Sequence, residues 1–550
     1  MGIPVATISA GGQTMDPAID VLSIEVRKQV DKIPEARLVL LDGSVARREF
    51  EVSDTAFFEP GKQLRIQLRY EGEKDQQVFE GLIVRQSVEA RAEGSELRVE
   101  LKDAALQLTR QRHSAVYQGK DHEILAKLIT PPLEKGSFPA TGVQHTQLVQ
   151  YYASDWDFLL ARADVNGQVV IVDDGKVSLR SMTEAPAPVA TYRWGLDEIH
   201  EFSLELDGGS QWAAITGSAW DQAQQRIPVP KPGKQLATQA GNVDPKQLAS
   251  KLGGNSYALN LPASLAPAEL EPWASARLAR SRLAFVRGRL VVPGRADIKP
   301  FDRVKLDGVG ERFEGEIVVA GVIQHVDHGG WRTELELGLS PEWFARTPDI
   351  ADAPAGGLLP PAPGLVIGTV DKFEQDPSGE LRVKVRLPTP DQRPVSVLAR
   401  VARPDAGKDP KSGISRGFVF WPEPGDEVVV GFLADDPRQA VVLGSLHGSK
   451  QAPPPVIGPP SADGQKRGLV SKAGTSIVFD DAKGKPSLTL ATAGNNTIVI
   501  DDGAASIEIR DQHGNAITMN ADGITLKSAN KFTIDAPGAV LIKGATVDIK

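Results

Sequence analysis

Cysteine is absent from the 550 residues of this chain, and its absence excludes several classes of protein. Without thiols the chain can form neither disulfide bonds nor thiolate metal sites, so its rigidity must come from packing and strand pairing. No stretch approaches the roughly 20 apolar residues that a membrane-spanning helix needs. Residues 1–6 (MGIPVA) lack a basic segment followed by an apolar core, so we expect synthesis to end in the cytoplasm.

Positive charge is also in deficit, because the formal net charge is −9 at pH 7. A nucleic-acid partner needs a basic face to neutralise phosphates, so we expect none. The one basic run is interpreted as a solvated or subunit-facing surface, and its members are Arg277, Arg280, Arg282, Arg287, Arg289 and Arg295. Otherwise 41% hydrophobic and 24% charged residues are ordinary values, which favour several folded domains over disorder.

Residue patterns suited to catalysis or metal binding are missing as well. His325 and His328 stand three apart in a predicted strand, where an odd separation points side chains to opposite faces. No carboxylate pair sits in an apolar setting that would raise one pKa, and no glycine-rich run has the phosphate-loop pattern. We therefore predict no catalytic residue, no metal site and no cofactor, with a glycan-binding or glycan-cleaving β protein as the alternative from another class.

Proline marks the borders between domains. Two proline-rich stretches, 353–364 (APAGGLLPPAPG) and 452–461 (APPPVIGPPS), are typical of semi-rigid linkers. They predict linkers at 351–364 and 448–467. The domains between them are then a block at 1–350, a small domain at 365–447 and a C-terminal block at 468–550.

The first block is predicted to be mainly β, because apolar and polar residues alternate in runs such as 64–70 and 97–101. Helical periodicity appears at 121–129, 154–165 and 268–282. A weak repeat is visible, since residues 79–84 (FEGLIV) resemble 313–318 (FEGEIV). It predicts two related β-barrels, at about 1–115 and 185–345, with a partly helical insertion at 116–184.

The middle block reads as a compact Greek-key barrel. Turn-forming residues such as 376–379 (DPSG) and 424–426 (PGD) separate its short apolar runs. The five predicted strands lie at 365–370, 381–387, 395–401, 427–432 and 440–446. Five strands in a block of this size favour an OB-fold.

The C-terminal block repeats short apolar pairs at positions i and i+2, separated by turn residues such as 501–503 (DDG) and 522–523 (DG). Roughly nine short strands are predicted, each with apolar groups on one face only. The apolar residues proposed to meet are Ile477, Phe479, Leu488, Leu490, Ile498, Ile500, Ile507, Ile509, Ile517, Met519, Leu526, Ile534, Ile542, Val547 and Ile549.

A single chain would leave that apolar face in water. Three chains wound around one axis would bury it, since each would supply one side of a triangular prism. Nine strands spaced by about 4.8 Å would form a shaft of roughly 40 Å. Ordinary hairpins or a β-sandwich remain as alternatives. The predicted fold class is therefore mainly β, with duplicated hub barrels, an OB-fold and a C-terminal trimeric β-helix or prism.

This order of domains resembles the VgrG family, in which a phage-type baseplate hub and its spike are fused. The motifs that carry the resemblance are 150–159 (QYYASDWDFL), 330–339 (GWRTELELGL), 424–433 (PGDEVVVGFL) and 442–446 (VLGSL). The resemblance implies a homotrimer whose six barrels form a pseudo-sixfold ring on a sixfold inner tube. The implied function is that of a structural, non-enzymatic spike that adapts this symmetry to a threefold, membrane-piercing needle.

Partners and subtype also follow from the resemblance. It implies inner-tube and baseplate proteins as partners, transient contact with a target membrane, and a PAAR-type tip protein docked at Val547, Asp548, Ile549 and Lys550. Residues 21–43 look more like extracellular contractile injection systems than type VI secretion tips or phage tail spikes, which are the alternatives. We expect the protein to be made in the cytoplasm and incorporated into an injection particle, which could be released outside the cell.

Overall fold

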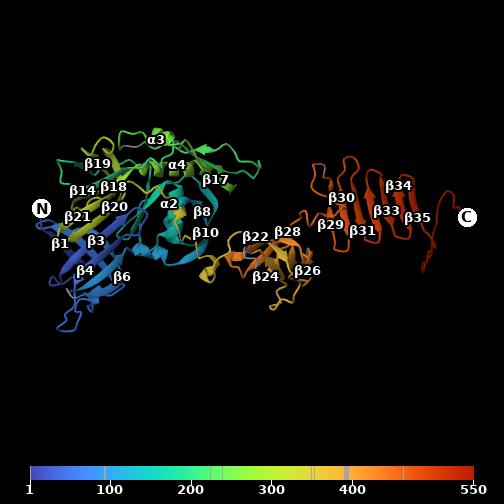
Figure 1. The fold of residues 1–550 in the computed structure, drawn as a ribbon, viewed down its shortest axis with the longest axis horizontal. Helices are drawn as coiled ribbons and strands as arrows, with labels where there is room; N and C mark the ends of the chain where they lie inside the picture. The colour runs from blue at the N-terminus through green and yellow to red at the C-terminus, as the bar shows by residue number, and fades with distance from the viewer. Residues whose placement is uncertain are drawn as a thin grey trace. The chain divides into compact units, whose positions relative to one another are not determined.

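The computed structural model describes residues 2–91, 94–222, 224–237, 240–347, 350–351, 353–388, 395–462 and 464–549. The chain divides into two compact units, residues 1–352 and 353–550 (Figure 1). Strands dominate both units. Within the described ranges the longest helix has 17 residues, and none combines the length and hydropathy required to cross a bilayer.

The first unit is organised around one 13-stranded sheet made from two repeats. The first repeat contains β1 (Pro4–Ala10), β2 (Gln13–Thr14), β3 (Val21–Gln29), β4 (Glu35–Leu41), β5 (Gln63–Tyr70), β6 (Gln76–Arg91) and β7 (Gly94–Lys102). The second contains β13 (Ala190–Arg193), β14 (Glu201–Leu206), β18 (Val286–Pro293), β19 (Arg303–Asp307), β20 (Gly315–Asp327) and β21 (Gly330–Leu337). The repeats join where β3 pairs with β20.

Each repeat has its own hydrophobic core. Alternation places Leu97, Val99 and Leu101 of β7 inside the first, and Leu335 and Leu337 of β21 inside the second. Because side chains alternate between faces along a strand, these residues line the interior while the intervening charged residues face outward. Two packed cores on one continuous sheet are the structural result.

Strand register shows that the two repeats share one topology, apart from the pairing of β13 with β19, which is parallel where β1 with β5 is antiparallel. In β6·β7, Ile83 lies opposite Leu101, and in β20·β21, Val319 lies opposite Leu337. The register shifts after that pair in both hairpins, at Ile83/Arg85 and Val319/Gly321. Because related sheets keep their bulges at the same position, the shared bulge marks the two hairpins as equivalent.

The predicted repeat motif was aligned wrongly by two residues. Phe79 lies opposite Ile66, but the residue opposite Leu306 is Gly315 and not Phe313. Equivalent positions in the two hairpins are therefore 236 residues apart, as Leu101 and Leu337 are. An error of two residues keeps each side chain on its correct face, since the strand period is 2.

A partly helical segment separates the repeats. Its elements are β8 (Arg112–Lys120), α1 (Asp121–Leu128), β9 (Glu134–Lys135), β10 (Gln144–Ser154), α2 (Asp155–Val165), β11 (Gln168–Asp173) and β12 (Lys176–Ser181). The predicted start and end of α2 are confirmed, because Ser154 accepts a hydrogen bond from the Asp157 N–H and Gly167 has φ of 65°. Trp156, Leu159 and Ala163 of this helix are buried.

A second insertion lies between β14 and β18. It contains β15 (Ile215–Trp220), β16 (Lys231–Pro232), α3 (Pro245–Lys251), β17 (Tyr257–Ser264) and α4 (Pro267–Leu283). The sequence prediction missed α3, which has a polar surface and only seven residues. Asp244 caps it by accepting a hydrogen bond from the Gln247 N–H.

The interpretation of the basic run as a surface is wrong for its first three members. Arg277, Arg280 and Arg282 lie on α4 and are 3–6% exposed. Asp164 of α2 pairs with both Arg277 (2.8 Å) and Arg280 (3.0 Å). The charges are buried because α4 packs inside the unit and a neighbouring helix supplies the carboxylate.

The middle of the second unit is a closed barrel in the order β22-β23-β24-β28-β27. Its strands are β22 (Leu365–Val370), β23 (Val383–Leu387), β24 (Val395–Val401), β27 (Glu427–Phe432) and β28 (Ala440–Ser445), with the hairpin β25 (Ala406–Lys408) and β26 (Ser415–Gly417) inserted. The predicted five-stranded barrel is confirmed. Val385, Val428 and Val430 are wholly buried in its core.

The chain continues as a seven-stranded antiparallel meander in a single layer (Figure 1). Its strands are β29 (Lys466–Val470), β30 (Ser476–Asp480), β31 (Ser487–Ala491), β32 (Thr497–Asp501), β33 (Ser506–Arg510), β34 (Ala516–Asn520) and β35 (Gly523–Lys527). The prediction of roughly nine strands was wrong for the last three pairs, since residues 528–549 form no strand. Among the described strands β35 pairs only with β34, so the sheet ends with an open edge.

Candidate functional site

One face of the β29–β35 sheet carries two unbroken rows of apolar side chains. Register places the members of each row directly opposite one another, with no shift between any two strands. The first row is Leu469, Ile477, Leu490, Ile498, Ile509, Ile517 and Leu526. The second is Phe479, Leu488, Ile500, Ile507, Met519 and Ile524. We call these two rows the apolar ladder.

The apolar ladder has no covering layer. Between residues 466 and 549, Val478 is the only apolar side chain that is buried in the described chain, and it belongs to the opposite face. Ile498 is 38% exposed and Leu526 is 56% exposed. Soluble proteins rarely leave a contiguous apolar face of this kind in water, so the face marks an interaction site.

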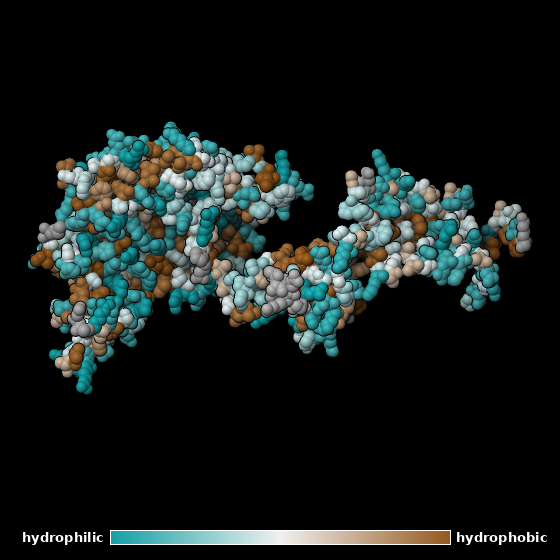
Figure 2. All heavy atoms as spheres, in the orientation of Figure 1, coloured by the Kyte–Doolittle hydropathy of each residue, from teal (hydrophilic) through white to brown (hydrophobic). Residues whose placement is uncertain are grey.

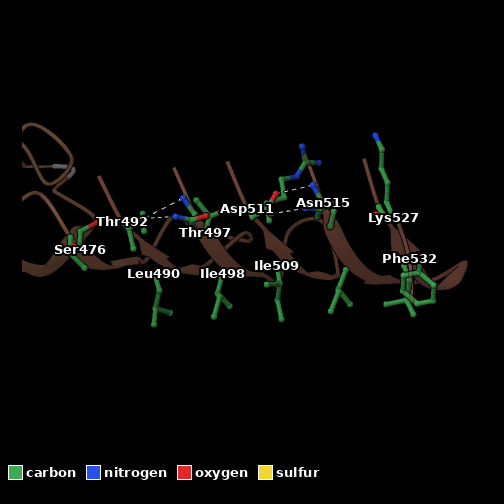
Figure 3. A pocket seen from close by; sticks show the side chains of 18 of the residues that line it. Ser476, Leu490, Thr492, Thr497, Ile498, Ile509, Asp511, Asn515, Lys527 and Phe532 are labelled. Atoms are coloured by element: carbon green, nitrogen blue, oxygen red, sulfur yellow. Dashed lines mark hydrogen bonds between the residues drawn. The ribbon is translucent and has the colours of Figure 1, made fainter. Parts of the chain in front are cut away.

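A groove of about 840 Å³ runs along the first row. Figure 3 shows Leu490, Ile498 and Ile509 projecting from the same side of the sheet, with Phe532 at the far end of the row. The polar residues Thr492, Asp511 and Asn515 lie at the strand ends. The groove is therefore lined by the apolar side chains of the first row and by polar residues at and near the strand ends, which include Ser476, Thr497, Arg510 and Lys527.

The opposite face is more polar than the apolar ladder. The residues opposite one another in its central row are Val478, Thr489, Val499, Glu508, Thr518 and Thr525. Charged residues such as Arg510 and Lys527 flank them. In the space-filling view this part of the chain shows brown apolar atoms between teal hydrophilic ones (Figure 2).

Side chains that bond their own turn hold the reversals between strands. In the turn between β33 and β34, the Asp511 carboxylate accepts hydrogen bonds from the N–H groups of His513 (2.9 Å) and Asn515 (2.8 Å). Gly514 has φ of 89°, a region that glycine enters without steric cost. These local bonds position each strand so that its apolar pair returns to the same face.

The structure brings together the predicted core residues from Ile477 to Leu526, but not the last ones. Ile534, Ile542, Val547 and Ile549 are exposed and lie outside any strand. Leu469 and Ile524 belong to the apolar ladder although they were not in the predicted set. Leu469 was missed because the residue two positions before it, Arg467, is charged, so β29 carries no apolar pair at i and i+2.

The predicted docking residues for a tip protein are in the same terminal segment. Val547 and Ile549 are 56% and 89% exposed. Asp548 lies between them, and Lys550 is outside the described residues. Their predicted role stays a prediction.

The first unit contains titratable groups in structural pairs. Burial alone would raise the pKa of Asp121, but the Arg162 guanidinium at 2.7 Å and the His145 ring at 2.9 Å lower it. Burial lowers the pKa of Arg277 to about 10. Its guanidinium lies 3.3 Å from the ring centre of Trp343. Each of these groups has a fixed partner, since Arg162 and His145 contact Asp121, and Asp164 and Trp343 contact Arg277.

Metal ligands do not gather in the described part of the chain, where no three His, Asp or Glu side chains could hold one ion. His325 lies on β20 and its ring is 3.5 Å from the Glu25 carboxylate. His328 lies in the turn after β20, and not in a strand as predicted.

Comparison with known families identifies the second unit. Residues 366–447 match the type VI secretion system/phage-baseplate injector OB domain. Residues 487–550 match the phage baseplate V C-terminal trimerisation domain. The chain is accordingly a structural protein of the spike class found in phage tails and type VI secretion systems.

The first unit gives the family of the whole chain. Residues 2–328, more than half of the sequence, match the Alg8 N-terminal domain. The chain therefore belongs to the Alg8 N-terminal domain family. No curated protein matches the chain.

Several solved structures are similar at low identity. A tail protein from Neisseria meningitidis is 17% identical with a TM-score of 0.44, over 63% of this chain and 99% of that one. A type VI secretion component from E. coli is 12% identical with a TM-score of 0.38, over 80% and 99%. The Francisella PdpA–VgrG complex is 10% identical with a TM-score of 0.40, over 96% and 80%.

Proposed function

We propose that three copies of this chain form the central spike of a contractile injection machine. The observation that carries the proposal is the apolar ladder, which lacks a covering layer on one chain. Complete burial of its half-exposed side chains would contribute about 1 kcal/mol each, or on the order of 10 kcal/mol per chain. The match of residues 487–550 to a trimerisation domain supports three as the number of chains.

The spike would act mechanically and not as an enzyme. Three meanders packed around one axis bury the apolar ladder and leave the Glu508 and Arg510 face in water. Bending such a prism would break many strand pairs together. Seven strands at about 4.8 Å spacing give a shaft of about 30 Å. Sheath contraction would drive this shaft against a target membrane.

The first unit would adapt the threefold spike to a sixfold inner tube. Its two repeats have the same strand order and the same bulge position, so three chains present six similar surfaces. A tip protein of the PAAR type would dock at Val547, Asp548 and Ile549. Among particle types we propose an extracellular injection system, with assembly in the cytoplasm and release in the particle.

Mass measurement tests the proposal directly. Native mass spectrometry or light scattering of the full chain at micromolar concentration should give a trimer. A protein that stays monomeric while its circular dichroism shows a folded β structure would refute it. Particle type is tested separately, because a gene neighbourhood with a membrane-anchoring complex would indicate a type VI system instead.

A further inference from the structure

The two repeats meet through one edge-to-edge junction inside each chain. Strand β3 pairs antiparallel with β20 from Ile24 opposite Val326 to Gln29 opposite Gly321. On the same edge of β20, β19 pairs only from Gly315 to Val318. The second half of β20 is thus an acceptor edge, and β3 fills it. We call this pairing the intrachain junction.

Each repeat also has one unpaired strand edge that is equivalent to one side of the intrachain junction. In the first repeat β6 is the equivalent of β20, and β5 pairs with it only as far as Leu82. Beyond that point, within the described residues, the same edge of β6 has no partner strand. Val84 and Val88 on this stretch are 40% and 44% exposed.

In the second repeat β14 is the equivalent of β3. Leu204 of β14 lies opposite Gly288 of β18, as Val26 of β3 lies opposite Ala36 of β4. Gly288 and Ala36 in turn lie opposite Leu337 of β21 and Leu101 of β7, which are equivalent positions in the two repeats. Among the described strands β14 pairs only with β18, so its outer edge is open. One chain therefore carries a donor edge and an acceptor edge that do not fill each other, because six strands lie between β14 and β6 in the same sheet.

We infer that β14 of one chain pairs antiparallel with β6 of the next, in the register that the intrachain junction prescribes. This interchain junction closes three chains into a ring of six repeats, since a head-to-tail contact generates a ring when its rotation closes. Transferring the register gives the opposed pairs Phe202–Ala90, Ser203–Glu89, Leu204–Val88, Glu205–Ser87, Leu206–Gln86 and Asp207–Arg85. The inference rests on the proposed trimer and adds its contact surface.

Charge supports this register independently of symmetry. In this register Asp207 would face Arg85, and Glu201 would face Arg91 just beyond the six opposed pairs. A slip of two residues in one direction would place Glu89 opposite Glu201, and a slip in the other would place it opposite Glu205. Like charges directly opposite one another in a sheet are destabilising, so both slips are disfavoured.

Apolar contacts agree with the same register. Leu204 and Phe202 are half-buried on the inner face of the second repeat, against its core. The interchain junction would cover the exposed Val88 with Leu204. The segment before β5 lies beside this edge too, because the Gln86 amide donates to the Ser53 carbonyl at 2.9 Å. Pairing would also remove the two open edges, which otherwise invite aggregation.

Engineered disulfides test the register, and the natural absence of cysteine makes the test clean. The double variant Ser87→Cys with Glu205→Cys should form a disulfide between chains on oxidation, giving a covalent trimer on a non-reducing gel. Directly opposed strand residues lie within the Cα separation that a disulfide requires. The slipped pair Ser87→Cys with Ser203→Cys should react at least tenfold more slowly, because diagonal partners are about 7–8 Å apart.

The intrachain junction supplies a matched positive control. Glu25→Cys with His325→Cys, which are opposed in β3 and β20, should form a disulfide that leaves each chain separate on the gel. If this control is oxidised within a trimer and the Ser87/Glu205 pair is not, the interchain junction is wrong and the proposed trimeric spike survives. If mass measurement shows a folded monomer, both the interchain junction and the proposed trimeric spike are wrong. Faster reaction of the slipped pair would also overturn the stated register.

Discussion

Replacing Ile498 by aspartate would place a carboxylate in the middle of the apolar ladder. Ile498 lies between Leu490 and Ile509, and in a trimer three aspartates would meet at one level of the axis. The lost burial costs about 1 kcal/mol per chain, since Ile498 is 38% exposed on the single chain. Burying the acid neutral at pH 7 requires a pKa raised by about three units, which adds about 4 kcal/mol.

These terms amount to about 15 kcal/mol over three chains. A factor of ten in an equilibrium constant corresponds to about 1.4 kcal/mol, so the association constant should fall by about ten orders of magnitude. At micromolar concentration and pH 7, light scattering should then show monomers in place of trimers. Lowering the pH to about 4 should restore part of the association, because the acid becomes easier to protonate.

The matched control is Thr497→Asp. Thr497 is the neighbouring residue of the same strand, points to the opposite face and lies opposite Arg510, so the new carboxylate stays solvated beside a positive charge. The Thr497→Asp trimer should dissociate at nearly the same protein concentration as the trimer of the natural chain. Equal stability of the Ile498→Asp and Thr497→Asp trimers would refute an inward-facing ladder.

Three further substitutions test the packing of the other domains. Asp164→Asn should destabilise the first unit by about 3–5 kcal/mol in denaturant unfolding, because Arg277 and Arg280 would keep buried charges without their shared carboxylate; an effect under about 1 kcal/mol would contradict this pairing. Asp121→Asn should cost about 3 kcal/mol at pH 7. Because the folded pKa of Asp121 is lowered, the natural protein should progressively lose this advantage as the pH falls below about 4, and a difference that does not shrink with falling pH would argue against it. Val385→Ala should lower the stability of the barrel by about 2 kcal/mol, and a neutral result would mean that the core refills the space.

Short-range patterns in the sequence predicted the local elements well. The five strands of the barrel and helix α2, with Ser154 as its cap, were visible because alternation, caps and turn residues act over a few residues. The apolar ladder was visible for the same reason, as pairs at i and i+2 fill one face of a strand. Helix α3 escaped because seven residues, four of them polar, are too few to show a helical period.

Properties that depend on distant partners were not predictable in this way. Arg277 and Arg280 look like surface residues until the position of Asp164, more than a hundred residues earlier, is known. The repeat was aligned two residues out because the sequence FEG recurs in both halves. The bulges at Ile83/Arg85 and Val319/Gly321 define the true equivalence, and no residue pattern in the sequence indicates them. The end of the sheet was not predictable either, because the apolar pairs in residues 528–549 look like those that form strands β30–β35.

The unshifted register of the β29–β35 sheet has a consequence for how such proteins diversify. Each strand returns its apolar pair to the same two rows, so a hairpin of two strands is an interchangeable unit. Duplicating or deleting one hairpin would change the length by about 10 Å and leave every other contact in phase. Length in this part of the molecule can therefore evolve in discrete steps by gene duplication, independently of the two repeats of the first unit.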